Sequence, residues 1–345
     1  MAKKKNILLI YTGGTIGMVK DYKTNSLLPF DFNNLKKKIP ELNQLPCKIK
    51  TVTFKKPIDS SNMNTKYLVD IINIIQEHYQ TTDGFVVLTG SDTMSYTASA
   101  ISFMLKNLCK PVIFTGSQLP IGDLRTDAKE NVITAIEIAS ANKNDEPIIK
   151  EVGLYFEYKL YRGNRTTKIN SEHFDAFASP NFPHLAESGV HLYFKEHLLL
   201  KKKCSEKLIV QKTLNQNVVV LKLFPGITEN TIKTILNTKD LKGVVLETFG
   251  AGNAPTNKAI INLLKEAIKK GIQIVNVTQC TTGRVNMRLY ETGIMLKNIG
   301  VISGKDITTE AALAKLMYLL ANKEVENTEF KKYFETSLRG EITDF

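Results

Sequence analysis

Short, unbroken apolar runs alternate with helical stretches along most of this chain, and this alternation constrains the fold more than any other feature. The apolar runs are bounded by turn residues and cover residues 7–11, 85–88, 112–114, 152–156, 218–223, 243–246 and 272–277. Helical patterns cover residues 65–79, 93–107, 127–141, 257–270 and 310–320. Strands that are apolar throughout are typical of parallel sheets covered by helices on both faces. The sequence therefore predicts an α/β fold with largely parallel sheets.

The alternation breaks down in a stretch rich in Lys and Leu between about residues 191 and 212. A chain of 345 residues is long enough for two domains. We therefore expect a larger N-terminal domain over residues 1–195, a linker over 196–212 and a smaller C-terminal α/β domain over 213–345. Active sites in such folds lie beyond the carboxyl ends of the strands, so the segments that follow the strands matter most.

Composition argues against several classes of protein. The formal net charge is +12, partly from lysine triplets at 3–5, 36–38 and 201–203. No nucleic-acid-binding motif accompanies this charge, so we expect a solvated basic surface and no nucleic-acid partner. No apolar run approaches the ~20 residues of a membrane helix, and the run at 7–11 is too short for a signal peptide. We expect a cytoplasmic protein without a membrane partner.

The cysteines and histidines are not spaced as metal ligands or redox pairs. The cysteines lie far apart without a CxxC motif, and so few of them in a long chain fit a reducing compartment. The histidines form no HxxxH pair. We therefore expect neither a metal nor a cofactor. The residues concerned are Cys47, Cys109, Cys204, Cys280, His78, His173, His184, His191 and His197.

A glycine-rich turn, Thr12-Gly13-Gly14-Thr15-Ile16-Gly17, follows the first apolar run. It is not a dinucleotide fingerprint, because its pattern is GGxxG and no acidic residue ends a clear second strand about 20 residues later. A hydroxyl on such a turn is accessible and can act as a nucleophile when a base is near. Alternatively, Thr12 and Thr15 only bond to the local backbone.

Further polar residues follow the other strands. Ser91 and Asp92 precede the helical pattern at 93–107, where either could cap the helix or take part in a site at its N-terminus. Lys168 follows the run at 152–156 and is either a surface lysine or, if desolvated, a base. Asp59 and Ser60 follow an extended segment and are typical of a loop cap. Together these residues indicate hydrolysis by a hydroxyl nucleophile without a metal.

These segments together resemble the bacterial-type asparaginase family, and in particular its cytoplasmic type I branch. The resemblance implies a two-domain asparaginase-like α/β fold, a larger N-terminal domain with a parallel or mixed sheet, and L-asparagine as substrate. It also implies a homodimer or homotetramer in which a neighbouring subunit completes the active site. The matching segments are residues 12–17, 90–94, 161–168, 174–180, 250–255 and 286–287.

The resemblance also implies a role for each site residue. Thr15 matches the nucleophile of the family. Ser91, Asp92 and Lys168 match a second catalytic group, in which the lysine deprotonates the hydroxyl or a water and the aspartate orients the lysine. The remaining matches concern substrate binding: Ser60 with Asp59 hold the α-carboxylate, Asp92 takes the α-ammonium, and Asn253 reaches the ammonium side from the partner subunit.

The chain departs from the family pattern at several positions. Ser91 stands where the family usually has Thr, and Thr89 stands where it usually has His. Tyr22 is only a candidate for the mobile-loop tyrosine, because its register is offset. Glu247 stands where related enzymes place an Arg, near the motif at 277–280 of an allosteric asparagine site. Loss of that positive charge predicts weak or absent activation by asparagine.

Three other functions remain open from the sequence. One is a relaxed glutaminase-asparaginase. Glutamine has one methylene more than asparagine, and a pocket discriminates one methylene by only about 1–3 kcal/mol, so the sequence does not settle the preference between the two amides. A non-enzymatic amino-acid-binding protein would not need Thr15, Asp92 and Lys168 together. An amidotransferase subunit acting on aminoacyl-tRNA shares this module but carries an added N-terminal domain, whereas here the first motif begins within the first 15 residues.

Overall fold

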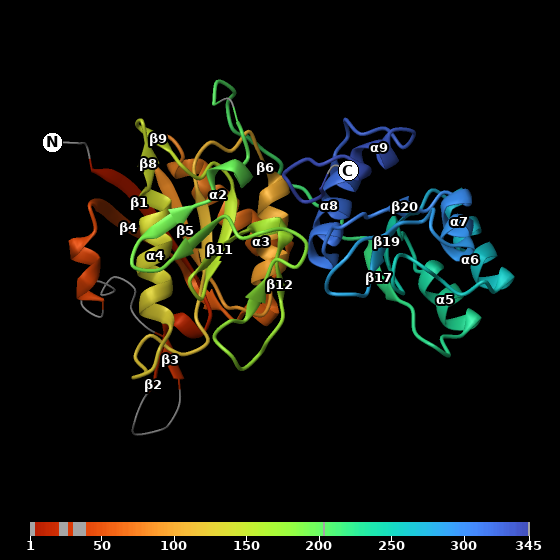
Figure 1. Cartoon of the computed structure of the whole chain (residues 1–345), viewed down its shortest axis with the longest axis horizontal. Helices are drawn as coiled ribbons and strands as arrows, with labels where there is room; N and C mark the ends of the chain where they lie inside the picture. Colours follow the sequence, from red (N-terminus) through yellow and green to blue (C-terminus); the bar gives the residue numbers. More distant parts are fainter. Residues whose placement is uncertain (1–3, 21–26, 30–38, 203, 344–345) are drawn as a thin grey trace. The chain divides into compact units, whose positions relative to one another are not determined.

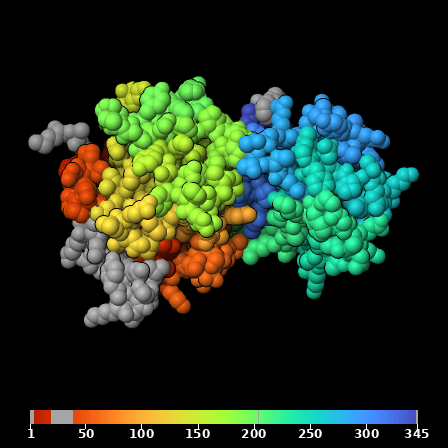
Figure 2. Space-filling view, turned by 60° about the horizontal axis from the view of Figure 1, so that its bottom comes forward, coloured from red at the N-terminus to blue at the C-terminus, as the bar shows by residue number. Residues whose placement is uncertain are grey.

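The computed structural model describes residues 4–20, 27–29, 39–202 and 204–343. The chain divides into two compact units, Met1–Lys212 and Thr213–Phe345 (Figure 1). Each unit is a continuous stretch of chain, as the sequence colouring of Figure 2 shows. No helix in the described part is long and apolar enough to cross a membrane.

The first unit is built on an eight-stranded sheet of strand order β15-β14-β11-β10-β7-β5-β1-β4. Strands β4, β1, β5, β7 and β10 are parallel to one another, and β11, β14 and β15 continue the sheet antiparallel. The sheet is therefore mixed. The bounds are β1 Lys5–Gly13, β4 Cys47–Ile58, β5 Gly84–Leu88, β7 Val112–Thr115, β10 Val152–Phe156, β11 Lys159–Arg162, β14 Ala186–Ser188 and β15 Leu192–Phe194.

Helices cover this sheet because its central strands are apolar on both faces. Ile7, Leu9 and Tyr11 of β1 join a buried cluster with residues of α4 (Ala128–Ser140). Leu8 and Ile10 point to the opposite face, since successive side chains of a strand alternate. Helix α2 (Thr65–His78) packs against β1 and against α3 (Met94–Met104). The apolar runs of the sequence are thus the buried strands.

Helix α3 ends three residues earlier than the pattern at 93–107 predicts. Leu105 and Lys106 form the short strand β6, which pairs antiparallel with β16 (Ile209–Val210). This pairing holds the segment 196–212 on the first unit. Shorter ribbons are β2 Met18–Lys20 with β3 Leu27–Pro29, β8 Asn142–Lys143 with β9 Glu146–Pro147, and β12 Thr167–Lys168 with β13 Phe177–Ala178.

The second unit contains a four-stranded parallel sheet of order β17-β18-β19-β20. Helix α8 packs against β17, β18 and β19, and α9 packs against α8 and β20. The strands are β17 Val218–Lys222, β18 Gly243–Thr248, β19 Gln273–Thr278 and β20 Ile302–Ser303. The helices are α5 Glu229–Leu236, α6 Lys258–Lys269, α7 Glu291–Asn298, α8 Thr309–Ala321 and α9 Phe330–Glu335.

The cysteines depart from the expectation drawn from their spacing. Cys109 and Cys204, 95 residues apart in the chain, form a disulfide with a Cα–Cα distance of 5.7 Å. The spacing of the cysteines, which contains no CxxC motif, did not predict this long-range pairing. The fold brings them together because Cys109 follows β6 and Cys204 precedes its partner β16. Sequence spacing could not show this, because the pairing depends on the short β6–β16 ribbon.

Candidate functional site

The two threonines of the glycine-rich turn after β1 differ in how deeply they are buried. Thr12 is fully buried, and its Oγ1 donates to the carbonyl oxygen of Leu88 at 3.1 Å. Thr15 begins a short 3-10 helix after Gly14, whose φ of 90° favours glycine, and its side chain is only partly buried. Thr12 therefore bonds to the backbone, whereas Thr15 is the less buried of the two threonines of this turn.

Two other loops pack directly on this turn. The pairing of β1 with β4 shifts so that Gly13 lies opposite Ile58, and the amide of Gly14 donates to the carbonyl of Ile58 at 3.1 Å. A Cβ on Gly14 would overlap the backbone of Gly90, and a Cβ on Gly90 would overlap the side chain of Ser60. Close glycine contacts thus bring together the turns that carry Thr15, Ser60 and Ser91.

Lys168 joins the second group of side chains that the sequence singled out. Its Nζ donates to Ser91 Oγ at 2.8 Å and to Asp92 Oδ1 at 2.7 Å. The Lys168 side chain is 18% exposed and that of Asp92 is 66% exposed. The ammonium is therefore shielded while the carboxylate remains open to a ligand. Ser91, Asp92 and Lys168 lie together, in the arrangement that the family resemblance implies.

Ser91 and Asp92 do not cap helix α3. The helix begins at Met94 with Thr93 as its N-cap, and no side-chain hydrogen bond caps it. Thr93 Oγ1 instead donates to the carbonyl of Ser60 at 2.8 Å. The capping interpretation of Ser91 and Asp92 is therefore wrong, because Lys168 engages both side chains. The side chains of Ser91 and Asp92 therefore bond to Lys168 and not to the N-terminus of α3.

Gln118 is a site residue that the sequence reasoning missed. Ser91 Oγ donates to Gln118 Oε1 at 3.3 Å, and Gln118 Nε2 donates to the carbonyl of His173 at 3.0 Å. The backbone amides of Gln118 and Leu119 donate to the buried carboxylate of Asp127 at 2.9 and 3.1 Å. Burial raises the pKa of Asp127, although these backbone bonds oppose the shift. The sequence did offer a signal for Gln118. The turn at 115–120 follows a parallel strand, as do the turns that carry Thr15 and Ser91.

Asp59 and Ser60 have different environments. Asp59 is exposed, and its Oδ1 accepts bonds from the amide and hydroxyl of Ser61, both at 2.9 Å. These bonds lower the pKa of the Asp59 carboxyl. Ser60 is 4% exposed and lies against Gly90. Asp59 is thus the cap of the short 3-10 helix Ser60–Asn62. The interpretation of this segment as a cap before the helix at Thr65 is wrong, because Asn64 caps that helix.

Asn253 belongs to the second unit, in the loop after β18. It forms an isolated bridge with Phe249, and its Oδ1 accepts a 2.7 Å hydrogen bond from Thr292 Oγ1. Glu247, at the end of β18, accepts a 2.7 Å bond from Thr309 Oγ1 and lies 3.5 Å from Lys222 Nζ. Tyr22 lies outside the described residues.

The first unit therefore combines a partly buried threonine, a serine bonded to a lysine, and an open carboxylate. Within the described ranges, no cluster of three or more His, Cys, Asp or Glu side chains could hold a metal ion. Two hydroxyls, one of which is bonded to Lys168, can divide nucleophilic attack and proton transfer between them. Such an arrangement suits cleavage of an acyl bond by a hydroxyl nucleophile.

Comparisons with known proteins find similarity to asparaginases over nearly the whole chain. The family described as "Asparaginase, N-terminal" matches residues 6–199, and the "Glutaminase/Asparaginase C-terminal domain" matches residues 217–334. L-asparaginase 1 of Escherichia coli strain K12 is 42% identical over 342 residues, which cover 99% of each chain. The crystal structure of L-asparaginase I from Vibrio cholerae is similar with a TM-score of 0.87 and 39% identity, covering 99% of this chain and 100% of that one. The thermostable L-asparaginase from Thermococcus kodakarensis gives a TM-score of 0.88 at 29% identity, covering 99% and 100%.

Proposed function

The chain belongs to the asparaginase family, and we infer from this membership that it is an amidohydrolase that converts L-asparagine to L-aspartate and ammonia. We propose that Thr15 is its nucleophile. The observation that carries this proposal is the hydrogen-bonded group of Lys168, Ser91 and Asp92, whose turn packs on Gly14 beside the Thr15 hydroxyl.

The proposed reaction begins with attack of Thr15 Oγ1 on the side-chain amide carbon of asparagine. An amide is a poor electrophile, so the hydroxyl needs a proton acceptor and the departing ammonia needs a proton donor. Ammonia leaves with that proton, and a water then hydrolyses the acyl-threonine ester to release aspartate. Ser91 supports both steps as a proton relay. Lys168, in its neutral amine form, is the group that deprotonates Ser91 or the water.

Substrate orientation is proposed to depend on two charged ends of the amino acid. Asp92 is the open carboxylate of the site and would take the α-ammonium, a favourable pairing of opposite charges. Ser60, with Asp59 beside it, would hold the α-carboxylate. This arrangement leaves the side-chain amide of the substrate directed towards the two hydroxyls.

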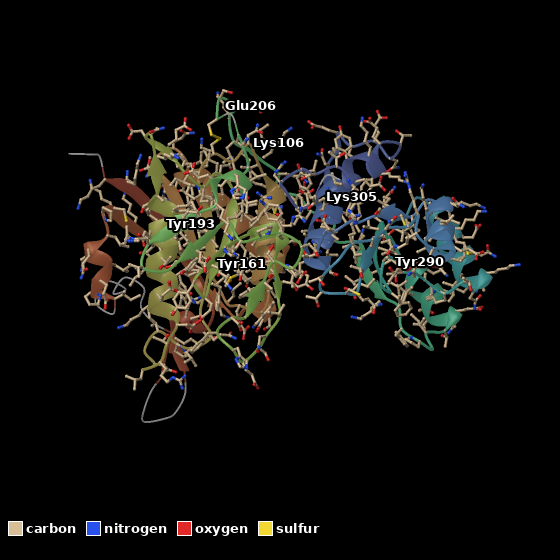
Figure 3. The ribbon with its side chains drawn as sticks, in the orientation of Figure 1. Lys106, Tyr161, Tyr193, Glu206, Tyr290 and Lys305 are labelled. Carbon is tan, nitrogen blue, oxygen red and sulfur yellow. A yellow bond between two sulfur atoms is a disulfide. The ribbon has the colours of Figure 1, made fainter. Side chains whose placement is uncertain are left out.

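A second subunit is proposed to complete the site through Asn253, as a homodimer or homotetramer. Thr292 fixes the Asn253 side chain. Close to Thr292 in the chain, Leu289 and Tyr290 are 57% and 54% exposed, and large exposed apolar side chains are typical of interaction surfaces. Tyr290 is labelled in Figure 3. We also propose a cytoplasmic location, without a nucleic-acid or membrane partner.

The decisive experiment is release of ammonia from L-asparagine and from L-glutamine by the purified protein. We expect kcat/KM to favour asparagine; comparable values for both amides would instead support the relaxed glutaminase-asparaginase. Thr15→Ala should lower turnover by several powers of ten while its melting temperature stays close to that of the wild type. A folded Thr15→Ala protein that keeps more than about a tenth of the rate would refute the nucleophile assignment.

A further inference from the structure

The Cys109–Cys204 disulfide joins the first unit to the segment that leads out of it. Cys109 lies in the loop between β6 and β7, and Cys204 lies in the segment 196–212. In Figure 3 the bond is drawn in yellow near the labelled residue Glu206. This region lies outside the group of residues proposed for catalysis.

The segment around Cys204 is anchored firmly on both sides. Upstream, the amide of Leu200 donates at 2.9 Å to Glu151, whose carboxylate forms a buried ion pair with Arg162. Downstream, Ile209 and Val210 form strand β16 and pair with β6. Cys204 lies about midway between Leu200 and Ile209. The disulfide therefore fixes the part of the segment that is farthest from the two anchors, and we call this part the excursion.

Two side-chain hydrogen bonds also join this part of the segment to the loop that carries Cys109. Lys202 Nζ donates to the carbonyl of Leu108 at 3.2 Å, and Asn107 Nδ2 donates to the carbonyl of Lys207 at 3.4 Å. Each such bond contributes about 0.5–1.5 kcal/mol. Breaking the disulfide would therefore remove the covalent link and leave only non-covalent contacts to hold residues 204–208.

The two sulfur atoms differ in exposure. Cys204 is exposed and Cys109 is half-buried, and both line an open cavity of about 390 Å³ together with Tyr79 and Lys110. Small-molecule sites have volumes of this order. Cys47, by contrast, is buried, and Cys280 is exposed but outside any disulfide. A small thiol in solution can therefore reach the Cys204 sulfur of this bond.

We propose that Cys109 and Cys204 form a reversible thiol–disulfide exchange site for a small thiol of the glutathione class. A thiolate attacks Cys204 Sγ, a mixed disulfide forms on Cys204, and Cys109 leaves as a thiolate that takes a proton from water. A second small thiolate attacks the sulfur of the bound small thiol. This attack releases Cys204 as a thiolate, and the two small thiols leave as their disulfide. The protein disulfide is thereby reduced by two electrons, and the two small thiols are oxidised. The same couple restores the bond in reverse.

This inference is independent of the proposed hydrolysis, and it accounts for a disulfide in a protein proposed to be cytoplasmic. Disulfides in such compartments are usually transient or redox-sensing. The physical consequence of reduction is greater freedom of the residues next to Cys204. Because Lys201, Lys202 and Lys207 lie close to Cys204 in the chain, reduction should let trypsin bind and cleave beside them more readily.

The test is a redox titration of the full-length protein in buffers of varied ratio of reduced to oxidised glutathione, quenched by alkylation and read by mass spectrometry. We expect one reversible transition between a Cys109–Cys204 disulfide and two alkylated cysteines. The wild-type protein suffices for this measurement, so no variant has to fold. If both cysteines remain fully alkylated at every ratio, or the bond persists at every ratio, the proposal is overturned.

Matched variants test which sulfur is attacked. Cys109→Ser should accumulate the glutathione adduct on Cys204 at least about tenfold faster than Cys204→Ser accumulates it on Cys109, because only Cys204 is exposed. Cys280→Ser is the control and should leave the wild-type transition unchanged. Equal adduct rates in the two disulfide variants would overturn the assignment of Cys204 as the attacked sulfur.

Limited trypsin digestion gives a second readout. Cleavage after Lys201 or Lys202 places Cys109 and Cys204 in different fragments, which the disulfide holds together on a non-reducing gel. We expect these fragments to comigrate as one band before reduction, and the reduced protein to be cut several-fold faster in this segment. Cleavage at the same rate in both redox states would contradict release of the excursion.

Discussion

Replacing Ser91 by alanine separates a catalytic role from a structural one. Ser91 Oγ accepts a bond from Lys168 Nζ at 2.8 Å and donates to Gln118 Oε1 at 3.3 Å. Alanine removes only this oxygen. Lys168 keeps its bond to Asp92, and Gln118 keeps its bond to the carbonyl of His173. The substitution therefore interrupts the proton relay without leaving a buried charge unpaired.

The expected magnitudes for activity and stability differ clearly. Loss of a general acid–base group costs about 10²–10⁴ in rate, or roughly 2.7–5.4 kcal/mol in the activation free energy. Loss of a hydrogen-bonded hydroxyl at a partly buried site costs about 1 kcal/mol of unfolding free energy or less. That corresponds to a change in melting temperature of about 2–4 °C. Because Ser91 does not cap α3, no further loss from the helix is expected.

The assay measures kcat for asparagine and the melting temperature on the same Ser91→Ala preparation. Ser99→Ala is a suitable control, because Ser99 lies on α3, the helix that follows Ser91, is fully buried and has a hydroxyl without a hydrogen-bond partner among the described residues. It should leave kcat unchanged. Ser91→Thr restores the residue usual in the family and should stay within about tenfold of the wild-type rate. A Ser91→Ala enzyme with nearly normal kcat, whether or not it is destabilised, would refute the relay.

The remaining predictions concern assembly, regulation and pH. Light scattering should report an even-numbered oligomer, and a monomer fully active at nanomolar concentration would exclude a site shared through Asn253. The rate should depend hyperbolically on asparagine concentration, because Glu247, which is bonded to Thr309, puts a carboxylate where the family resemblance implies an Arg. A Hill coefficient clearly above one would show a working effector site. Burial raises the pKa of Glu341, but Lys315 and neighbouring backbone amides more than offset it, so its folded pKa lies below the ordinary value. The ionised Glu341 therefore stabilises the folded protein above a pH of about 4.3, and this contribution is lost as the pH falls through the folded pKa. The melting temperature of the wild type should thus fall more steeply with acid than that of the Lys315→Met/Glu341→Leu double variant.

Much of the fold follows from the apolar pattern, and the failures have local causes. The strands around 7–11, 85–88, 112–114 and 152–156 are β1, β5, β7 and β10, because unbroken apolar runs must be buried on both faces. Strands β14 and β15 are three residues long, and β11 is four residues long with Lys159 and Arg162 at its ends, so no period distinguishes them from loops. Helix α3 ends early because β16, more than 100 residues later in the chain, pairs with Leu105 and Lys106. A local pattern cannot show such a pairing.

The candidate site was predictable where parallel strands end together, and not elsewhere. Thr15 and Ser91 follow β1 and β5, so the convergence of carboxyl ends places their turns side by side. The same rule covers Gln118 after β7, but it cannot show that its side chain turns towards Ser91. That orientation depends on the buried Asp127 carboxylate, which holds the backbone amides of the turn.

Lys168 reaches the site by a different route, which explains why the residues alone left open whether it is a surface lysine or a base. The chain does not pass directly from β10 to Lys168, because β11 turns back antiparallel. A short 3-10 helix, Gly163–Arg165, then packs against α3 and leads into β12, where Lys168 lies. Asn164, Arg165 and Thr166 are almost completely buried there. Since α3 begins just after Ser91 and Asp92, this packing against α3, and not the end of a parallel strand, carries the ammonium to its two partners.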